Sequence, residues 1–350
     1  MPLILNVGKK FLMNKAKQRG DLPETMRAVV LARRCDPEDL RVTQVALPHM
    51  RQGWVLVKVK AFGLNRSELM LRAEEVDEDY INSPIIPGIE CVGIVVDAGN
   101  TRFKKDEPVV ALMGGMGRNF DGSYAEYVLL PEKQVFSVDG LVDQMGWDEI
   151  AAIPETWFTA WGSLFTCLRI RPEENLLIRG GTSALGLAAL QIAQGIGCSV
   201  AATTRKPDRV ALLKSVGAKS VFVDDETLSS QVKDRYPNGF DCILELVGPK
   251  TLMQSFRFAN NPGRVCMSGI LSKPYTLSNF DPIKDIPNGV SLSGFFSNYP
   301  DQTTITELFS FINKHAIHPF IAARYSLDEI GEAHRAMENS ELVGKAVVIV

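Results

Sequence analysis

The residues best suited to chemistry form a glycine-rich turn at positions 180–186. Gly181 and Gly186 match the first and third glycines of a G-x-G-x-x-G pattern, and Ser183 stands at the second. Such a turn lets phosphate oxygens reach backbone N–H groups at the positive end of a helix, where a Cβ atom would block them. The turn therefore favours a phosphate-bearing nucleotide as ligand; the alternative is an ordinary strand-to-helix turn with no ligand.

The segments around the turn help to choose between these two interpretations. An apolar run at 176–178 precedes the turn, and an Ala- and Leu-rich helical pattern follows it to about Gly195. Further strands are predicted at 198–204, 220–223, 241–246, 263–268 and 291–296, with a helix at 208–215. This β-α-β-α-β order is typical of a doubly wound parallel sheet, so we predict an α/β fold of the Rossmann type with a dinucleotide at the turn.

The first part of the chain has a different pattern. Short β-branched runs at 26–31, 54–61, 92–97, 108–112 and 124–130 alternate with turns, which is typical of a β-rich domain. An apolar helical segment at 148–168, interrupted at Pro154, leads into the Rossmann region. After it, a helix is predicted at 304–314 and an apolar strand at 344–350. We therefore predict an extension at 1–25, a discontinuous β-rich domain at 26–152 and 301–350, and a nucleotide-binding domain at 153–300.

Composition and charge limit the other classes of function. The net charge of −3 gives no overall basic field for nucleic acid. No apolar run approaches the roughly 20 residues that a membrane-spanning helix needs. The six cysteines lack the close spacing of a metal-binding pair or a secreted disulfide framework. We expect reduced thiols in a cytoplasmic protein, with neither nucleic acid nor membrane as a partner.

Residues 1–25 have a basic character of their own. Lysines and one arginine precede the first acid, Asp21, and apolar residues are interleaved with them. Mitochondrial transit peptides can begin in this way, but Ser and Arg are scarce here. The favoured interpretation is an extension that packs on the body of the protein or is disordered, with mitochondrial import as the alternative.

Several motifs together resemble those of the medium-chain dehydrogenase/reductase superfamily, in its zinc-free quinone oxidoreductase-like branch. They lie at 63–69, 87–93, 122–128, 154–161 and 180–186, and at Gly344-Lys345. The resemblance extends from about Met26 to Val350. It implies that the β-rich domain is GroES-like and that the chain is an oxidoreductase with a nicotinamide cofactor.

Two positions distinguish this chain from the zinc-dependent members of that superfamily. Asn65 stands where those relatives have a cysteine ligand, and Ile89 stands where they have a histidine. Asn is a weak zinc ligand and Ile is none, so we expect no bound metal. Without a Lewis acid, hydride must go to an acceptor that is already electrophilic, such as a quinone or an α,β-unsaturated carbonyl.

The end of the second Rossmann strand indicates which nicotinamide cofactor binds. NAD-binding relatives carry an acid there for the ribose 2′-OH, whereas this chain has Thr204, Arg205 and Lys206. Two cations and a hydroxyl suit a 2′-phosphate, so we predict NADPH; the alternative is a solvated charge pair. Asp224, after the third strand, would repel that phosphate unless it paired with Arg205 or Lys206.

The resemblance implies further contacts along the cofactor and the substrate. They are Gly181, Ser183, Ala184, Leu185 and Gly186 at the turn, Thr159 by the nicotinamide, Val247, Gly248, Ser268 and Gly269 by the bridging ribose and diphosphate, Phe295 and Phe296 from the sixth strand, and Lys345 from the tail. Asn65 would face the cleft for a small-molecule substrate. Because side chains alternate along a strand, one of the two Phe rings should face the core and the other the cleft.

No general acid is evident from the residues alone. Tyr80 lies in the segment where enoyl-thioester reductases of the superfamily carry a catalytic Tyr, but acids surround it, which favours a solvated loop. Tyr124 is a second possibility, although an inward-facing strand residue is the simpler interpretation. An enoyl-thioester reductase is therefore an alternative function. A cofactor-binding protein with a structural or RNA-associated role is another.

The predicted sixth strand, at 291–296, also suggests an assembly. As the last strand of the Rossmann unit it should lie at a sheet edge, and neither Lys nor Pro protects it. Pairing with the same strand of a second copy would satisfy that edge, and the resemblance implies the same homodimer.

Overall fold

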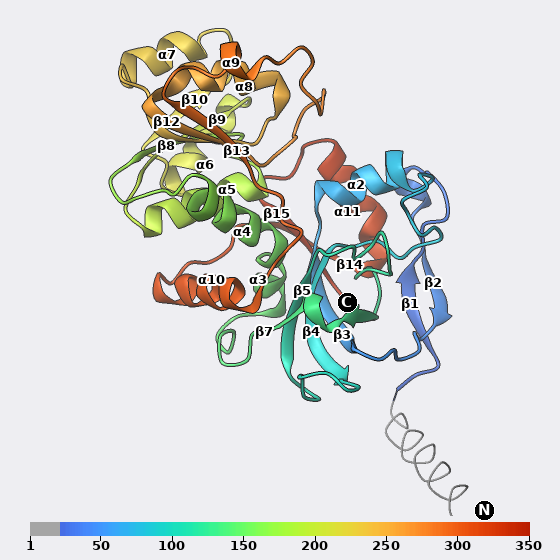
Figure 1. The fold of residues 1–350 in the computed structure, drawn as a ribbon. Helices are drawn as coiled ribbons and strands as arrows, with labels where there is room; N and C mark the ends of the chain where they lie inside the picture. Colours follow the sequence, from blue (N-terminus) through green and yellow to red (C-terminus); the bar gives the residue numbers. More distant parts are fainter. Residues whose placement is uncertain (1–21) are drawn as a thin grey trace, which may run out of the picture.

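The computed structural model describes residues 22–350, and the charged and apolar residues at positions 1–21 lie outside the described part. The expected extension at 1–25 therefore falls mostly outside it, and both the favoured interpretation and the alternative of mitochondrial import remain expectations. Two domains lie side by side in the described chain (Figure 1).

A six-stranded parallel sheet forms the core of the second domain, as the sequence predicted. In spatial order its strands are β10 (Ser220–Val223), β9 (Ser199–Thr204), β8 (Asn175–Arg179), β11 (Phe240–Glu245), β12 (Ala259–Met267) and β13 (Val290–Gly294). The chain starts in the middle of the sheet, moves to one edge, and returns to build the other half. This order is that of a Rossmann fold, and it leaves the carboxyl ends of β8 and β11 side by side at the reversal point.

Helices connect these strands and cover the sheet. They are α5 (Ala184–Gly195), η5 (Pro207–Arg209), α6 (Val210–Ser215), α7 (Leu228–Arg235), α8 (Pro249–Phe258) and α9 (Pro282–Asp285). The central strands β8, β9 and β11 are buried on both faces, which is typical of a covered parallel sheet.

The first domain is built on a seven-stranded, mostly antiparallel sheet. Its strands are β14 (Ile321–Ser326), β15 (Lys345–Ile349), β3 (Trp54–Gly63), β4 (Glu90–Asp97), β5 (Pro108–Leu112) and β7 (Val135–Ser137), with β6 (Tyr127–Pro131) paired to β3. A separate antiparallel pair consists of β1 (Thr25–Val29) and β2 (Val42–Ala46). The short helices are η1 (Pro37–Asp39), α2 (Arg66–Met70), η2 (Leu71–Glu75), η3 (Glu132–Gln134), η6 (Leu327–Glu329) and α11 (Ile330–Glu338).

Four helices lie between the two sheets. They are α3 (Trp147–Ala151), α4 (Pro154–Trp161), η4 (Gly162–Cys167) and α10 (Gln302–Lys314). The apolar face of α10 packs on α4 and joins the same buried cluster as α5. Residues of β5 and β7 in the first domain belong to that cluster too, so the helix contacts both sides and the predicted boundary at residue 301 stays a prediction.

The chain end then closes the first domain and contacts the second. β15 pairs with β3, and Gly344, just before it, bridges to Ser183 in the glycine turn. The C-terminal strand therefore connects the two domains at the turn.

Within residues 22–350, no helix is long and apolar enough to cross a membrane. The six cysteines are all free thiols.

Candidate cofactor and substrate site

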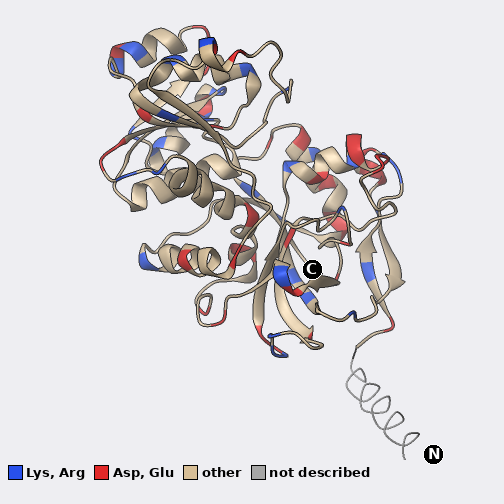
Figure 2. Ribbon diagram, in the orientation of Figure 1, with Lys and Arg blue, Asp and Glu red and all other residues tan. Residues whose placement is uncertain are grey.

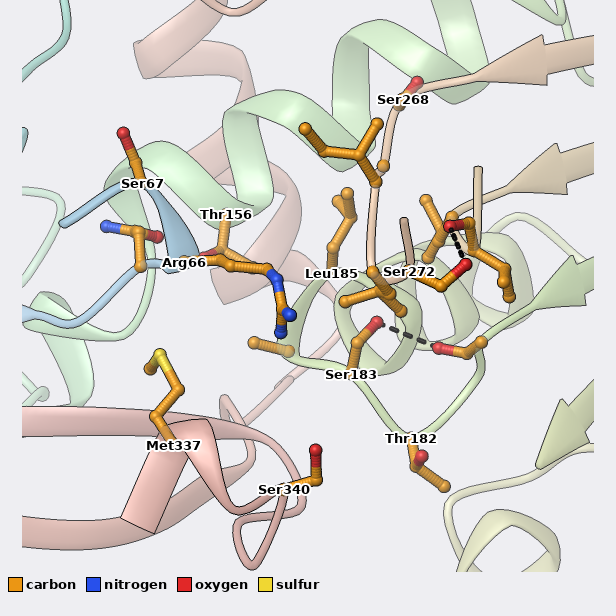
Figure 3. A pocket seen from close by; sticks show the side chains of 18 of the residues that line it. Arg66, Ser67, Thr156, Thr182, Ser183, Leu185, Ser268, Ser272, Met337 and Ser340 are labelled. Carbon is orange, nitrogen blue, oxygen red and sulfur yellow. Dashed lines mark hydrogen bonds between the residues drawn. The ribbon is translucent and has the colours of Figure 1, made fainter. Parts of the chain in front are cut away.

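One cavity of about 670 Å³ is lined by residues of both domains. From the Rossmann side it takes the glycine turn and the ends of β9, β11 and β12, and from the other side α2, the start of α4 and the loop after α11. In Figure 3 the side chain of Arg66 extends into the cavity between Thr156 and Ser183, while Met337 and Ser340 line the wall below. The volume and the shared lining are typical of a cofactor and substrate site.

The glycine turn presents part of its backbone to this cavity and buries the rest. Thr182, Ser183, Ala184 and Leu185 line the cavity and are partly exposed. Ser183 caps α5, because its Oγ accepts a hydrogen bond from the Gly186 N–H at 3.0 Å. The amides at the start of α5 therefore face the cavity at the positive end of a helix, where an anion is stabilised.

The two glycines of the motif lie behind this surface, outside the cavity lining. A Cβ at Gly181 would lie 2.8 Å from the Ala202 Cβ, and one at Gly186 would lie 2.6 Å from the Gly180 carbonyl oxygen. Both glycines are buried, so they allow the turn, α5 and β9 to pack closely. Their effect on a ligand is to hold the cavity-facing amides in place.

At the end of β9, Thr204 and Arg205 line the cavity, whereas Lys206 is exposed and outside the lining. Arg209 also lines it, and its guanidinium donates to the Ser340 carbonyl of the first domain at 2.8 Å. Sequence analysis missed Arg209, because only the start of the following helix brings it back toward the strand end. Two guanidinium groups therefore lie at this end of the cavity.

Asp224 lines the same end of the cavity, but its partner is not the one that the sequence suggested. The fully buried Arg179 donates to both Asp224 carboxylate oxygens, at 3.0 and 2.9 Å. Arg179 ends β8, and β9 lies between it and β10, after which Asp224 follows. The bidentate pair offsets the acid from within the domain and leaves Arg205 out of the interaction.

The turns after β11 and β12 border the middle of the cavity. Val247, Ser268 and Gly269 line it, whereas Gly248 is buried behind them. The buried Glu245 carboxylate accepts hydrogen bonds from the N–H groups of Val247 (2.8 Å) and Gly248 (3.1 Å). Glu245 at the end of β11 therefore holds the turn in place. Because its carboxylate is occupied by these two N–H groups, Glu245 does not line the cavity.

A buried polar cluster lies where the two domains meet. The Lys345 ammonium donates to Asn65 Oδ1 at 2.7 Å and to Thr156 Oγ1 at 2.7 Å. It also pairs with Glu90 Oε1 at 2.6 Å, and Asn65 Nδ2 donates to the same Glu90 oxygen at 2.8 Å. Asn65 and Thr156 line the cavity, whereas Lys345 does not and is 3% exposed. The resemblance implied that Lys345 reaches the cofactor, but three acceptors hold its ammonium inside.

A second buried acid, Glu68, supports this cluster from α2. Its carboxylate accepts hydrogen bonds from the Asn65 N–H at 2.9 Å and the Ile89 N–H at 3.0 Å. Burial raises the pKa of Glu68 to about 7, although the Ile89 hydrogen bond and the nearby Lys345 oppose the shift. Glu68 thereby fixes Asn65 and Ile89 from behind.

Glu155, in the first turn of α4, lines the cavity beside Thr156. Its Oε1 accepts hydrogen bonds from Thr159 Oγ1 at 2.8 Å and Ser297 Oγ at 3.1 Å. Burial raises the pKa of Glu155 above its ordinary value; Lys345 opposes the shift and Glu90 adds to it. Thr159 is buried and outside the lining, so the structure puts Glu155 between it and the cavity. A lone acid in an otherwise apolar helix was the available signal for this residue.

Phe295 and Phe296 follow β13 and face opposite ways. Phe295 packs against Phe158, and its ring lies where a Cβ on Gly162 would be. Phe296 lines the cavity and is 71% exposed. One ring therefore contacts the core and the other the cavity, as predicted, but β13 ends at Gly294 and both residues lie after the strand, so strand alternation is not the reason.

The two candidate tyrosines lie away from the cavity. Tyr80 is 57% exposed in the segment after η2, where Asp and Glu gather (Figure 2) and pair with Arg34, Arg118 and Lys273. Tyr124 is fully buried; its hydroxyl bonds to His334 Nε2 at 2.9 Å and its ring stacks on Phe62. Neither lines the cavity. Tyr80 has a raised pKa from burial and nearby Glu75 and Glu78, which opposes ionisation of its hydroxyl.

No group of three or more His, Cys, Asp or Glu side chains in the described chain is arranged to hold a metal ion. Around Asn65 the available oxygen ligands already surround the Lys345 ammonium. A divalent cation there would meet a fixed positive charge.

Comparison with known proteins identifies the same two domains. The family model described as "Alcohol dehydrogenase GroES-like domain" matches residues 51–140, and that described as "Zinc-binding dehydrogenase" matches residues 184–314. The chain is 27% identical to the quinone oxidoreductase of Mus musculus over 337 residues, which cover 93% of this chain and 98% of that protein.

Solved structures show the same fold along almost the whole chain. An NAD-dependent alcohol dehydrogenase is 26% identical, with a TM-score of 0.82, covering 93% of this chain and 100% of that one. The mycobacterial protein Rv1454c, solved in complex with NADPH, is 23% identical with a TM-score of 0.81, covering 93% and 100% of the two chains. At that identity the second likeness concerns the fold alone.

Proposed function

The chain belongs to the medium-chain dehydrogenase/reductase superfamily, in its quinone oxidoreductase-like branch, and from that premise we propose an NADPH-dependent, zinc-independent reductase. Its acceptor is a quinone or an α,β-unsaturated carbonyl. That the chain is an oxidoreductase follows from the family; the cofactor, the acceptor and the independence from zinc are our proposal.

The observation that carries the choice of NADPH is the charge at the end of β9. Arg205 and Arg209 line the cavity beside the buried Thr204 hydroxyl, and the nearby acid, Asp224, is already paired with Arg179. Two guanidinium groups can each form two hydrogen bonds to a phosphate, and the Asp224 charge, which would repel that phosphate, is offset by Arg179. This arrangement favours a 2′-phosphate over a free hydroxyl.

The rest of the cavity fits the remaining parts of the same cofactor. Ala184 and Leu185 line the cavity at the start of α5, the positive end of the helix, where a diphosphate would be stabilised. Bound NADPH supplies a hydride. The residues of this chain bind and orient the reactants: Asn65 and Thr156 at the far end are held rigid by Lys345, and Met113 and Ile89 exclude water.

Independence from zinc rests on the cluster around Lys345. Its ammonium already neutralises Glu90 and occupies the acceptors of Asn65 and Thr156. We therefore expect purified protein to contain no stoichiometric zinc by elemental analysis, and chelators to leave turnover unchanged. One tightly bound zinc per chain would contradict the proposal.

The test of the function is a spectrophotometric screen of NADPH oxidation with a quinone, an α,β-unsaturated aldehyde and an enoyl thioester. We expect turnover with the first or the second. Turnover confined to the enoyl thioester would favour the alternative reductase, and NADPH binding without any turnover would favour a structural role.

We also propose a cytoplasmic location, because six unpaired thiols, three of them partly exposed, suit a reducing compartment. Fractionation of cells that express the full chain tests it, and recovery in mitochondria would favour the alternative role of the N-terminal residues.

A further inference from the structure

We propose that Glu155 is the proton donor of the reduction, delivering a proton to the acceptor after hydride has arrived. This inference rests on the proposed function, since it completes the same reaction. It is carried by the position of Glu155, by its hydrogen bonds and by the absence of a cationic partner.

Three acids line the cavity, and two of them are committed to ion pairs. Glu75 pairs with Arg118 at 2.7 Å, and Asp224 pairs with Arg179 at 2.9 Å. Glu155 has no ion pair among residues 22–350. A carboxyl without an ion-pair partner, partly removed from water, favours its neutral form, which is the form that can donate a proton.

The hydrogen bonds to Glu155 also suit a neutral acid. Thr159 Oγ1 and Ser297 Oγ both donate to Oε1, at 2.8 and 3.1 Å. No donor among the described residues reaches Oε2. These two hydrogen bonds by themselves lower the pKa of Glu155, but burial, which raises it, is the largest effect. Because both donors fall on Oε1, Oε2 remains free to carry the proton of the neutral acid, on a carboxyl that borders the cavity.

Burial and one neighbour favour this state. The Glu155 backbone N–H donates to Glu90 Oε2 at 2.7 Å, so the Glu90 carboxylate lies close by and opposes a second negative charge. The Lys345 ammonium, which is paired with Glu90, lowers the pKa of Glu155, but burial is the largest effect and raises it. Glu68, the other acid of the cluster, is buried behind Asn65 and does not line the cavity.

The reaction then balances in atoms and electrons. The electrophilic carbon of the acceptor receives a hydride from NADPH, and the electron pair of its double bond moves to the carbonyl oxygen or the α-carbon. The Oε2–H bond of Glu155 breaks, its proton goes to that atom, and solvent reprotonates the carboxylate. In sum, NADPH, one proton and the acceptor are converted into NADP⁺ and the reduced acceptor.

The experiment compares Glu155→Gln and Glu155→Asp with the parent chain, using Glu149→Gln as the control. Gln keeps the Oε1 acceptor for Thr159 and Ser297 but has no acidic proton. Glu149 is a half-buried acid of the adjacent helix α3, bonded to His318 and outside the cavity lining. We expect Glu155→Gln to lower kcat at least ~100-fold for every acceptor that the parent reduces, which is the low end for a lost general acid.

Three readouts distinguish a proton donor from a structural residue. The NADPH dissociation constant of Glu155→Gln should stay within about 2-fold of the parent value, which is about 0.4 kcal/mol. Glu155→Asp should recover part of kcat. The parent kcat should fall as pH rises through the Glu155 pKa, while the residual rate of Glu155→Gln should lose this dependence.

Infrared spectroscopy of the protein without cofactor gives a readout independent of turnover. At neutral pH the parent should show carboxylic acid carbonyl absorption from Glu155 in addition to that of the buried Glu68, whose pKa is raised to about 7; the parent-minus-variant spectrum should contain a carbonyl band for Glu155→Gln and none for Glu149→Gln. Unchanged turnover and pH profile in Glu155→Gln, or an unchanged band, would overturn the role of Glu155 alone. A parent protein that reduces none of the three acceptors would overturn the proposed function itself, and with it the donor.

Discussion

At the scale of single residues, Arg205 decides which nicotinamide cofactor binds. Its guanidinium lines the cavity at the end of β9, and no acid pairs with it among the described residues. We expect the parent chain to bind NADPH at least ~10-fold more tightly than NADH, about 1.4 kcal/mol for the phosphate contacts. Arg205→Ala should remove most of that difference, as measured by fluorescence titration with both cofactors.

Lys206→Ala is the matched control, since its side chain is exposed and outside the cavity lining. It should change the preference by far less than Arg205→Ala. Equal dissociation constants for NADPH and NADH in the parent chain would refute the proposed cofactor.

A second residue-scale prediction concerns His334, which bonds to the Tyr124 hydroxyl at 2.9 Å. Burial, with a smaller effect of Arg72, lowers the pKa of His334 to about 3. The folded state keeps the imidazole neutral, whereas the unfolded chain takes up a proton below pH ~6.5. The free energy of unfolding should therefore fall as pH drops from ~6.5 toward 3, with about 2 kcal/mol lost through this group by pH ~5.

The measurement is urea unfolding of the parent and of His334→Gln at pH ~7 and ~5. The variant should be less stable at neutral pH because the packed ring is lost, but its stability should decline less on acidification. A parallel decline in the two proteins would show that His334 does not contribute to the loss.

At the scale of elements, the packing of α5 against β8 and β9 positions the phosphate-binding amides. A Cβ at Gly186 would lie 2.6 Å from the Gly180 carbonyl oxygen, and that neighbour is backbone, which cannot move aside cheaply. We expect Gly186→Ala to push the start of α5 away from the turn. Both the melting temperature and NADPH affinity should fall, as measured by circular dichroism and fluorescence titration.

The variant Ser183→Ala is the control for Gly186→Ala, because it removes the cap of α5 without disturbing the packing of the helix against the turn. It removes the oxygen that accepts from the Gly186 N–H, which should cost about 1 kcal/mol of stability, while the turn keeps its shape. A Gly186→Ala protein that binds NADPH as tightly as the parent would show that the exact position of α5 does not matter to the ligand.

The elements that the sequence predicted well are those with strong local patterns. The apolar β8 and β11, the glycine turn and the return strand β15 could all be found from periodicity and composition. The prediction for Lys345 was incomplete because the position of its ammonium depends on Glu90, which is 255 positions away along the chain. Arg209 was missed for a similar reason, because its partner Ser340 is 131 positions away. Glu155 lies inside the motif at 154–161, but nothing in that motif showed that the Glu155 side chain lines the cavity.

At the scale of the whole molecule, the cavity depends on both domains being held together. Contacts between them surround it: Arg209 donates to the Ser340 carbonyl, and the Gly114 N–H donates to Asn298 Oδ1 at 3.0 Å. Lys and Arg are interspersed with Asp and Glu along the ribbons of both domains (Figure 2). The charged residues to which we give a role in the proposed function, Arg205, Arg209 and Glu155, line the cavity.

The last prediction, a homodimer, concerns the free edge of the Rossmann sheet. β13 ends the six-stranded sheet and pairs only with β12 among the described strands. Large apolar side chains are exposed around it: Ile283 is 89% exposed, Phe296 71% and Tyr299 81%. An unpaired strand edge beside apolar side chains favours pairing with another strand, and a two-fold axis lets a second copy supply its own β13.

Ser291→Lys tests this dimer more cleanly than a proline at Leu292, because Leu292 also packs in the Rossmann core whereas Ser291 is exposed on the edge strand. Near a two-fold axis the lysines of the two copies would repel each other, and Lys at an edge opposes strand pairing. Light scattering at micromolar concentration should show a dimer for the parent and a shift toward monomer for Ser291→Lys. Ser230→Lys, on exposed α7, should remain dimeric. A monomeric parent chain would contradict the prediction, because it would mean that the exposed β13 edge stays unpaired in solution.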